Sequence, residues 1–320
     1  MPDPAPSIVF WGTPEAAASC LRFMLDARCN VVGAVTQPDR PVGRKQVVTP
    51  SAVKLLAISH SIPVVQPERI KDETFVEQIR AWKPDICVIV AYGRIITQTM
   101  IDIPSAFLNL HFSLLPRYRG AAPVQWAVMH GATATGVTVQ HLALELDTGD
   151  IIMQHSVPIS EDDTAESVLD RCVNVGAPLL VQAINAVHAG TAPRTPQSND
   201  EATYAPKINK QHGFINWRMP VRRICNQVRA CMPWPAATTW MEDIPCKILA
   251  ARVDSEEAHE LVPGTVLESK KHVKVAAQPG IVEILELQPS NRPKMSAEAF
   301  LAGHRHAVTR FQSWTGDHPE

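Results

Sequence analysis

The stretch DICVIVAYGRIITQTMIDIPSAFLNLHFSLLP, residues 85–116, contains two apolar runs of strand length, at 86–92 and 106–112. The first has no polar alternation, which is typical of a strand that is covered on both faces. Similar runs at 7–11 and 31–36 are each followed by segments whose pattern indicates a helix. Strands that alternate with helices in this way predict an α/β domain with a Rossmann-like, mostly parallel sheet.

Two polar side chains, Asn109 and His111, interrupt the second apolar run. They lie two residues apart, so on a strand they share one face with Cα atoms about 6.6 Å apart. Alone, they would most simply be a core histidine and an asparagine that braces a loop. The carboxyl ends of parallel strands, however, are where open α/β sheets bind ligands. Asp147, in LDTGD, closes a later apolar segment and is expected there as a third member of the site.

An amide, an imidazole and a carboxylate suit acyl transfer to an amine. The amide can donate a hydrogen bond to an oxygen that gains negative charge, and the imidazole can donate to it or move protons. The carboxylate fixes the tautomer of the imidazole. This chemistry requires no metal. The seven cysteines form no C-x-x-C pair, which indicates free thiols in a reducing compartment and no zinc site.

The pattern changes in the last third of the chain. Residues 191–209, rich in Pro, Thr, Ser and Asn, are predicted to link a catalytic domain, 1–190, to a C-terminal domain, 210–320. Short strands with Gly or Pro turns predict an OB-like β-barrel beyond the linker. Residues 210–320 hold 14 Lys and Arg against 12 Asp and Glu, whereas 1–209 hold 16 against 20. Arg222 and Arg229, seven residues apart on one helix face, form either a solvated face or a phosphate-contacting stripe.

A longer motif surrounds the three polar residues. The motif consists of Asn109-x-His111-x-Ser113-Leu114-Leu115-Pro116, then Arg119-Gly120, then Leu146-Asp147-x-Gly149. It resembles the signature of the folate-dependent formyltransferases. The resemblance continues through FWGTPE (10–15), YAPKINKQHGFINW (204–217), VRACMPWP (228–235) and FLAGHR (300–305), so it covers nearly the whole chain.

The resemblance implies specific roles. Asn109, His111 and Asp147 would be catalytic, and the formyl donor would be 10-formyltetrahydrofolate. The residues expected to bind that donor are Tyr92, Gly93, Arg94, Ile95, Ser113, Leu114, Leu115 and Pro116. The loop PDRPVGRK (38–45) resembles an insertion of the family members that formylate charged initiator methionyl-tRNA. Its cations Arg40, Arg44 and Lys45 would contact that RNA, although GRKQVV departs from the usual Gly- and Lys-rich form.

Other functions remain open at this point. A formyltransferase acting on a nucleotide-linked amino sugar would share the three catalytic residues and much of the C-terminal domain. An enzyme that formylates glycinamide ribonucleotide would leave residues 210–320 unexplained. A tRNA-binding protein without catalysis is disfavoured by the complete motif. No signal peptide and no membrane-spanning run are evident, so we expect a cytoplasmic enzyme, a monomer without membrane contact.

Overall fold

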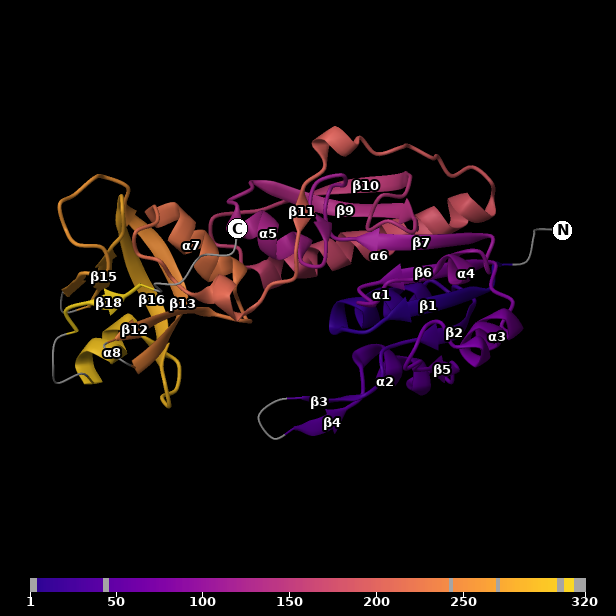
Figure 1. The fold of residues 1–320 in the computed structure, drawn as a ribbon, viewed down its shortest axis with the longest axis horizontal. Coiled ribbons are helices and arrows are strands. Elements are labelled where there is room, and N and C mark those ends of the chain that lie inside the picture. Colours follow the sequence, from indigo (N-terminus) through magenta and orange to yellow (C-terminus); the bar gives the residue numbers. More distant parts are fainter. Residues whose placement is uncertain (1–4, 43–45, 242–243, 269–270, 304–307, 314–320) are drawn as a thin grey trace. The chain divides into compact units, whose positions relative to one another are not determined.

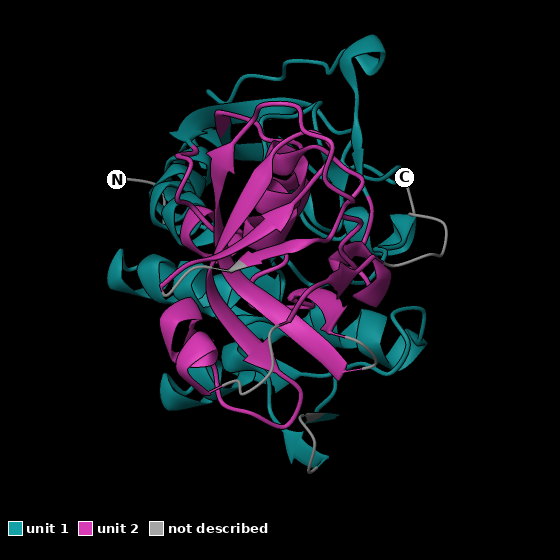
Figure 2. Ribbon diagram, turned by 90° about the vertical axis from the view of Figure 1, so that its left-hand side faces the viewer, with its two compact units in different colours: residues 1–123, 135–158, 169–205 teal, residues 124–134, 159–168, 206–320 magenta. Residues whose placement is uncertain are grey.

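The computed structural model describes residues 5–42, 46–241, 244–268, 271–303 and 308–313. The chain forms two compact units (Figure 2). Unit 1 comprises residues 1–123, 135–158 and 169–205, and unit 2 comprises 124–134, 159–168 and 206–320. Two short segments from the middle of the sequence therefore pack with the C-terminal part. The domain limits predicted from the sequence, at 190 and 210, stay a prediction.

Unit 1 is built on a seven-stranded sheet in the order β10-β9-β7-β6-β1-β2-β5 (Figure 1). The strands are β1 (Ile8–Gly12), β2 (Val31–Val35), β5 (Val64–Val65), β6 (Ile86–Val90), β7 (Ala106–His111), β9 (Ala134–His141) and β10 (Ile151–Pro158). The five strands from β7 to β5 pair in parallel, and β9 pairs antiparallel with β7. The prediction of a mostly parallel α/β sheet is confirmed. Every residue of β1 and of β6 is buried, as expected for strands covered on both faces.

Helices alternate with these strands. They are α1 (Glu15–Asp26), α2 (Ala52–Ser59), α3 (Glu73–Ala81), α4 (Gln98–Ile101), α5 (Pro123–Met129) and α6 (Ala165–His188). The start of α2 shows how the sequence sets such a boundary. The Ser51 side chain accepts a hydrogen bond from the backbone N–H of Lys54, which satisfies one of the otherwise unpaired donors of the first turn.

The basic loop of the sequence is a β-hairpin, formed by β3 (Arg40–Val42) and β4 (Val47–Thr49). It lies outside the main sheet, near α2 (Figure 1). Val47 and Val48 are exposed on it, so packing against a core does not account for this hairpin. Its base is tied down by Asp39, which forms an ion pair with Lys54 of α2 at 2.6 Å and accepts a hydrogen bond from Gln66.

Unit 2 contains an antiparallel sheet that closes almost into a barrel. Its strands, in the order β14-β15-β16-β13-β12-β18, are β14 (Val266–Glu268), β15 (Val273–Ala276), β16 (Ile281–Pro289), β13 (Ile244–Ser255), β12 (Ala237–Met241) and β18 (Phe311–Gln312), with β17 (Met295–Ser296) on β16. The two ends of this order meet, because Phe311 N–H donates to the Gly264 carbonyl and Val266 N–H to that of Thr309. The helices α7 (Val221–Ala230) and α8 (Ala297–Gly303) pack against this sheet. The predicted OB-like barrel is thus confirmed as a nearly closed antiparallel barrel.

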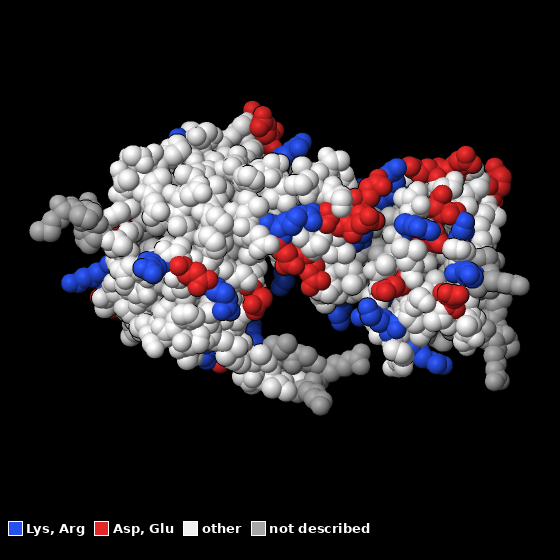
Figure 3. All heavy atoms as spheres, turned by 180° about the vertical axis from the view of Figure 1, so that it is seen from behind, with Lys and Arg blue, Asp and Glu red and all other residues white. Residues whose placement is uncertain are grey.

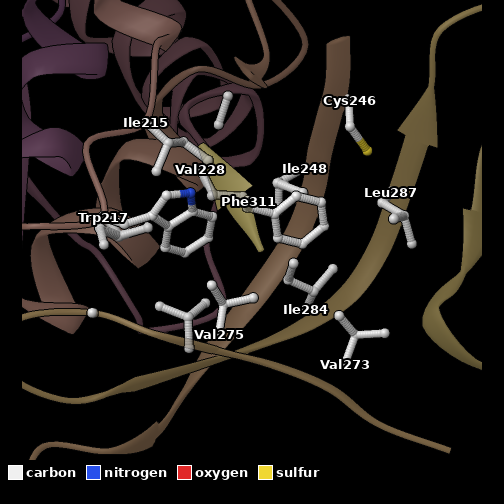
Figure 4. Packing of buried hydrophobic residues seen from close by; sticks show 14 of the residues in the cluster. Ile215, Trp217, Val228, Cys246, Ile248, Val273, Val275, Ile284, Leu287 and Phe311 are labelled. Atoms are coloured by element: carbon white, nitrogen blue, oxygen red, sulfur yellow. The ribbon is translucent and has the colours of Figure 1, made fainter. Parts of the chain in front are cut away.

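The barrel interior is apolar. Trp217 and Phe311 stack with ring centroids 6.0 Å apart, and Ile248 and Ile284 from the neighbouring strands β13 and β16 belong to the same cluster (Figure 4). The indole N–H of Trp217 donates to the hydroxyl of Thr239, so its one polar atom is satisfied inside the core. Burial of this cluster explains why so short a set of strands forms a stable unit.

Charge is mixed on the surface. Figure 3 shows Lys and Arg interspersed with Asp and Glu on one face of the described residues, without a broad area of one sign. Any attraction of an RNA to that face would depend on local groups. None of the helices within the described residues combines the length and the apolar character that a bilayer crossing requires.

Candidate active site

Strand β7 places Asn109 and His111 as the sequence predicted. Both are buried polar residues on a strand whose other central positions are apolar core. Asn109 lies opposite Gln140 of β9, and His111 lies opposite Thr138. The side chains of these four residues therefore share one face of the sheet. Polar residues gather on this face because the alternation of β9, VTVQH, matches that of β7.

The side chain of Asp147 lies beside Asn109 and His111, but the chain segment that places it there differs from the expected strand. The strand before it, β9, runs antiparallel to β7 and ends at His141, beside Leu108. Asp147 therefore does not close a strand, and that part of the prediction is wrong, although its carboxylate does lie beside Asn109 and His111 at the carboxyl end of β7. The chain returns through the loop 142–150, where the Asp147 backbone adopts φ +54° in the left-handed region. Asp tolerates this conformation better than most residues.

The carboxylate of Asp147 is held by neutral donors. Oδ1 accepts hydrogen bonds from the side-chain amides of Asn109 at 3.1 Å and Gln140 at 3.3 Å. Oδ2 accepts from the backbone N–H of Gly120 at 2.8 Å. The Asp147 side chain is 8% exposed, so both oxygens lie in a largely dry environment that strengthens these bonds.

The orientation of His111 is fixed from one side. Its Nε2 lies 2.9 Å from the Tyr118 carbonyl, which can only accept, so Nε2 carries a proton. The other nitrogen, Nδ1, lies 3.7 Å from Asp147 Oδ1, beyond hydrogen-bond distance. A neutral His111 therefore presents an unprotonated Nδ1 beside the carboxylate. A charged His111 would have an anionic neighbour. Burial raises the pKa of the Tyr118 phenol, against an opposing effect of Arg117.

The loop after β6 contains four of the residues predicted to bind the donor. The ring of Tyr92 packs edge-on against Trp11 in the core, and burial raises the pKa of its phenol to about 12. Its carbonyl accepts from Thr13 and Gln37. The Arg94 guanidinium donates to the carbonyls of Pro67 and Glu68.

The same loop also offers groups that are not engaged. Within the described residues, the backbone amides of Gly93, Arg94 and Ile95 have no hydrogen-bond partner. The side chain of Ile95 is 81% exposed. The parts of this loop available to a ligand are thus backbone donors and one apolar side chain, while the side chains of Tyr92 and Arg94 hold the loop itself.

The turn Ser113–Pro116 is mainly braced by the protein. The Ser113 hydroxyl donates to the Arg117 carbonyl, and Leu115 N–H donates to the Thr138 hydroxyl. The Pro116 carbonyl accepts from the backbone of Thr203. Leu114 and Pro116 are the partly exposed members of the turn. The assignment of these four residues to donor binding stays a prediction.

The structure describes only one of the three residues predicted to contact RNA. Arg40 is exposed on β3, whereas Arg44 and Lys45 lie outside the described residues. Asp39, its neighbour in the sequence, pairs with Lys54 and not with Arg40. Within the described residues, the Arg40 side chain has neither an ion pair nor a hydrogen bond, so its charge is available to a ligand.

The arginine stripe on α7 is engaged within unit 2. Arg222 forms ion pairs with Glu256 at 2.6 Å and Glu161 at 3.2 Å. Arg229 donates to the carbonyls of Ser160 and Asp163. These contacts hold the segment 159–168 against the helix. The stripe is therefore occupied by protein groups, and phosphate contact is not its evident role.

Sequence reasoning missed two residues of the site, Gln140 and Gln197, and gave no role to Arg119 of the motif. Gln140 contacts the carboxylate of Asp147, Gln197 contacts its carbonyl, and Arg119 contacts Gln197. Gln140 could have been found, because it continues the polar alternation of β9 opposite Asn109. Gln197 lies in the polar segment 191–209, which has no periodic pattern. No group of three or more His, Cys, Asp or Glu suited to a metal occurs among the described residues.

Family comparisons agree with this arrangement. The sequence profile of the formyl transferase domain matches residues 7–184, and the profile of the formyl transferase C-terminal domain matches residues 207–305. The mostly parallel sheet, the polar cluster on one of its faces and these two matches define the class of protein as a two-domain formyl transferase.

Full-length relatives narrow this class. The methionyl-tRNA formyltransferase of Trichlorobacter lovleyi is 40% identical over 93% of this chain and 94% of its own. That of Pelobacter propionicus is 41% identical over 93% of each chain, and that of Clostridioides difficile 38% identical over 93% of this chain and 96% of its own. The chain belongs to the methionyl-tRNA formyltransferase family.

Solved structures share the fold at lower identity. WlaRD, a sugar 3N-formyl transferase, superposes with a TM-score of 0.67 at 22% identity, over 91% of this chain and all of that one. An N-formyltransferase of Helicobacter canadensis, solved with folinic acid and dTDP-3-aminofucose, gives 0.65 at 20%, over 91% of this chain and all of that one. HypX of Aquifex aeolicus with tetrahydrofolic acid gives 0.62 at 18%, over 93% of this chain and 47% of that one.

Proposed function

We propose that this enzyme transfers the formyl group of 10-formyltetrahydrofolate to the α-amino group of methionyl-initiator tRNA, and that Asn109, His111 and Asp147 act at the reacting centre. The observation that carries the proposal is the convergence of an amide, an imidazole and a carboxylate on one face of the sheet. The acceptor is supported by the names of the relatives. The donor is supported by solved proteins of this fold that contain tetrahydrofolic or folinic acid.

Asn109 is proposed to stabilise the charge that builds on the formyl oxygen. Its side-chain nitrogen carries two hydrogens, and one hydrogen bond from it goes to Asp147. The second N–H remains for the formyl oxygen. A donor aimed at developing charge contributes about 10²–10³ in rate.

His111 is proposed to accept the proton that the attacking amine releases. The Tyr118 carbonyl keeps the proton of the neutral ring on Nε2, which leaves Nδ1 as the acceptor. The resulting imidazolium would face Asp147, whose charge stabilises it. The new bond joins the amine nitrogen to the formyl carbon as the bond to the donor nitrogen breaks. The proton lost by the amine balances the one that the departing nitrogen gains.

The loop after β6 is proposed to hold the donor. The amides of Gly93, Arg94 and Ile95, which have no hydrogen-bond partner among the described residues, suit the carbonyl and ring nitrogens of a pterin, because these require donors at fixed positions. The exposed Ile95 side chain suits a flat apolar ring. When bound, the donor supplies an activated formyl group, and the protein supplies binding, orientation and proton handling.

Acceptor recognition is proposed for the β3–β4 hairpin and the C-terminal domain, 210–320. Arg40 has no ion-pair partner among the described residues, and Arg44 and Lys45 add two further cations in sequence. Arginine binds phosphate bidentately and stacks on unpaired bases, as an RNA 3′ end requires.

We also propose a cytoplasmic monomer. All seven cysteines are unpaired, which suits a reducing compartment, and light scattering of the purified enzyme tests the monomer.

An assay with two alternative acceptors tests the proposal. The enzyme is given formyl-labelled 10-formyltetrahydrofolate and either charged initiator tRNA or a nucleotide-linked amino sugar. We expect transfer to the tRNA and none above background to the sugar. Transfer to the sugar alone would show that the acceptor is misassigned. Binding of the tRNA without transfer would reject the catalytic roles.

A further inference from the structure

The segment from Thr195 to Ala205 is attached to unit 1 at both ends. Thr195 exchanges two backbone hydrogen bonds with Ile151 of β10, at 2.8 and 3.0 Å. At the other end, β11 (Tyr204–Ala205) pairs with β8 (Arg119–Gly120). Although its composition is that of a linker, this segment, which we call the strap, is a fixed part of the catalytic unit.

Gln197 of the strap reaches the turn that carries Asp147. Its Nε2 lies 2.8 Å from the carbonyl of Asp147, 2.8 Å from that of Gly149 and 3.0 Å from Oε1 of Gln140. Two hydrogens thus serve three acceptors, two of them backbone atoms of the turn. The third, Gln140, itself donates to the Asp147 carboxylate.

A buried arginine determines which way the Gln197 amide points. Arg119 is 2% exposed, and its Nε and Nη2 donate to Gln197 Oε1 at 3.1 and 2.8 Å. Because a guanidinium can only donate, the oxygen must face Arg119 and the nitrogen must face the turn. Nη1 of Arg119 donates to Oδ1 of Asn199, also in the strap.

The turn needs such support because its backbone is not in a low-energy conformation. Asp147 has φ +54°, in the left-handed region that residues with a side chain disfavour. Such geometry persists only where surrounding contacts over-determine it. Gln197 supplies two of these contacts directly at the peptide groups of Asp147 and Gly149.

We propose that Gln197 is a positioning residue for formyl transfer: its amide fixes the backbone of the Asp147 turn, and Arg119 fixes the amide. This inference rests on the proposed role of Asp147. Gln197 contacts neither Asn109 nor His111 among the hydrogen bonds of the site, so its effect on the reaction passes through the Asp147 turn.

Three variants test whether Gln197 positions the Asp147 turn for the reaction or only stabilises the fold. Gln197→Glu keeps an oxygen for Arg119 but replaces the donor to the turn with an acceptor. Gln197→Leu removes both functions, and Asn199→Ala removes the other strap contact of Arg119 while leaving Gln197 intact. Each is measured for kcat, for KM with charged tRNA and with donor, and for Tm.

We expect Gln197→Glu and Gln197→Leu to lower kcat by up to about 100-fold, as a misplaced catalytic group does. Both KM values should stay close to wild type, and Gln197→Glu should keep a wild-type Tm. Asn199→Ala should keep a near-normal kcat. A wild-type kcat for Gln197→Glu, or an equal loss of kcat in Asn199→Ala, would overturn the proposal.

A double variant distinguishes this inference from the assignment of Asp147. If Gln197 acts through Asp147, adding Gln197→Leu to Asp147→Asn should cause no further loss of kcat. Multiplicative losses would overturn the positioning role while leaving that of Asp147 intact. If Asp147→Asn alone is fully active, the proposed role of Asp147 fails, and the positioning role that depends on it fails too.

Discussion

Two buried carboxylates, one in each unit, face a histidine in different ways. Glu283 of the barrel is 5% exposed and contacts Nε of Arg252 at 2.7 Å and Nδ1 of His272 at 2.6 Å. Asp147 is 8% exposed, but the donors to its carboxylate are uncharged amides, and His111 Nδ1 stays 3.7 Å away. The barrel carboxylate is matched by a neighbouring cation, whereas that of Asp147 is hydrogen-bonded but not paired with a fixed charge.

The different surroundings of the two carboxylates indicate that Glu283 and Asp147 have different roles. Burial opposes the ionisation of Glu283, but the hydrogen bonds and charges of Arg252 and His272 outweigh it and lower its pKa below the usual 4.5. Such a pair is a structural link between strands. In the proposed mechanism, Asp147 instead faces a group that becomes positive only during the reaction, the imidazole of His111. The two clusters differ both in the donors, a guanidinium against amides, and in the distance from the histidine to the carboxylate.

The largest effect is expected at β7. Asn109→Ala and His111→Ala should each lower kcat by about 10²–10⁴, because each removes a group proposed to act on the reacting atoms. Steady-state transfer to charged initiator tRNA at saturating substrates measures this. The matched control is His272→Ala, which removes the other histidine that faces a carboxylate. If His272→Ala reduced kcat as much as His111→Ala, the contrast between the clusters would be lost.

A smaller effect is expected from the hairpin, which should act on capture of the acceptor and not on the reaction itself. Arg44→Ala should lower kcat/KM for charged tRNA by about tenfold and reduce the slope of its salt dependence by about one, because phosphate contacts release counterions. Binding of a folate analogue should not change. The control is Arg80→Ala, an exposed arginine on α3 paired with Glu77. If Arg44→Ala weakened binding of the folate analogue as much as it lowered kcat/KM for charged tRNA, Arg44 would belong to the donor site or would support the fold.

The smallest effect is expected in the barrel, and it concerns stability. Because the folded-state pKa of Glu283 is lowered, its charge stabilises the fold above the unfolded value of 4.5 and this contribution is lost as pH falls through the folded value. Glu283→Gln should therefore lower the free energy of unfolding by about 1–3 kcal/mol near neutral pH. The difference should vanish in acid, and kcat should remain normal. Denaturant unfolding from neutral to acidic pH measures it; a difference constant with pH would exclude the charge as its source.

The sequence predicted those features that depend on local pattern. Apolar runs located β6 and β7, and their alternation placed Asn109 and His111 on one face. Residue patterns do not encode strand direction, so the antiparallel course of β9 was missed although Asp147 was chosen correctly as a neighbour of His111. The hairpin at 40–49 was interpreted as a loop because prolines and a glycine punctuate it.

Contacts between distant segments account for what the sequence could not predict. Gln197 and Arg119 are 78 residues apart, and nothing in the composition of 191–209 distinguishes Gln197 from the polar residues around it. Its role becomes visible only when the strap is placed beside the Asp147 turn. Likewise, Glu283 is one acidic residue among many in the sequence until β13, β15 and β16 bring Arg252 and His272 to it.

Single-turnover formyl transfer by Asp147→Asn tests the central claim most directly. Asparagine keeps the shape and tolerates the left-handed backbone, but it removes the charge proposed to stabilise the His111 imidazolium. The rate of the chemical step should fall by about 100-fold or more, while dissociation constants for the folate analogue and charged tRNA stay at wild-type values. A chemical step at the wild-type rate would contradict the account, because the carboxylate would then be a structural group like Glu283.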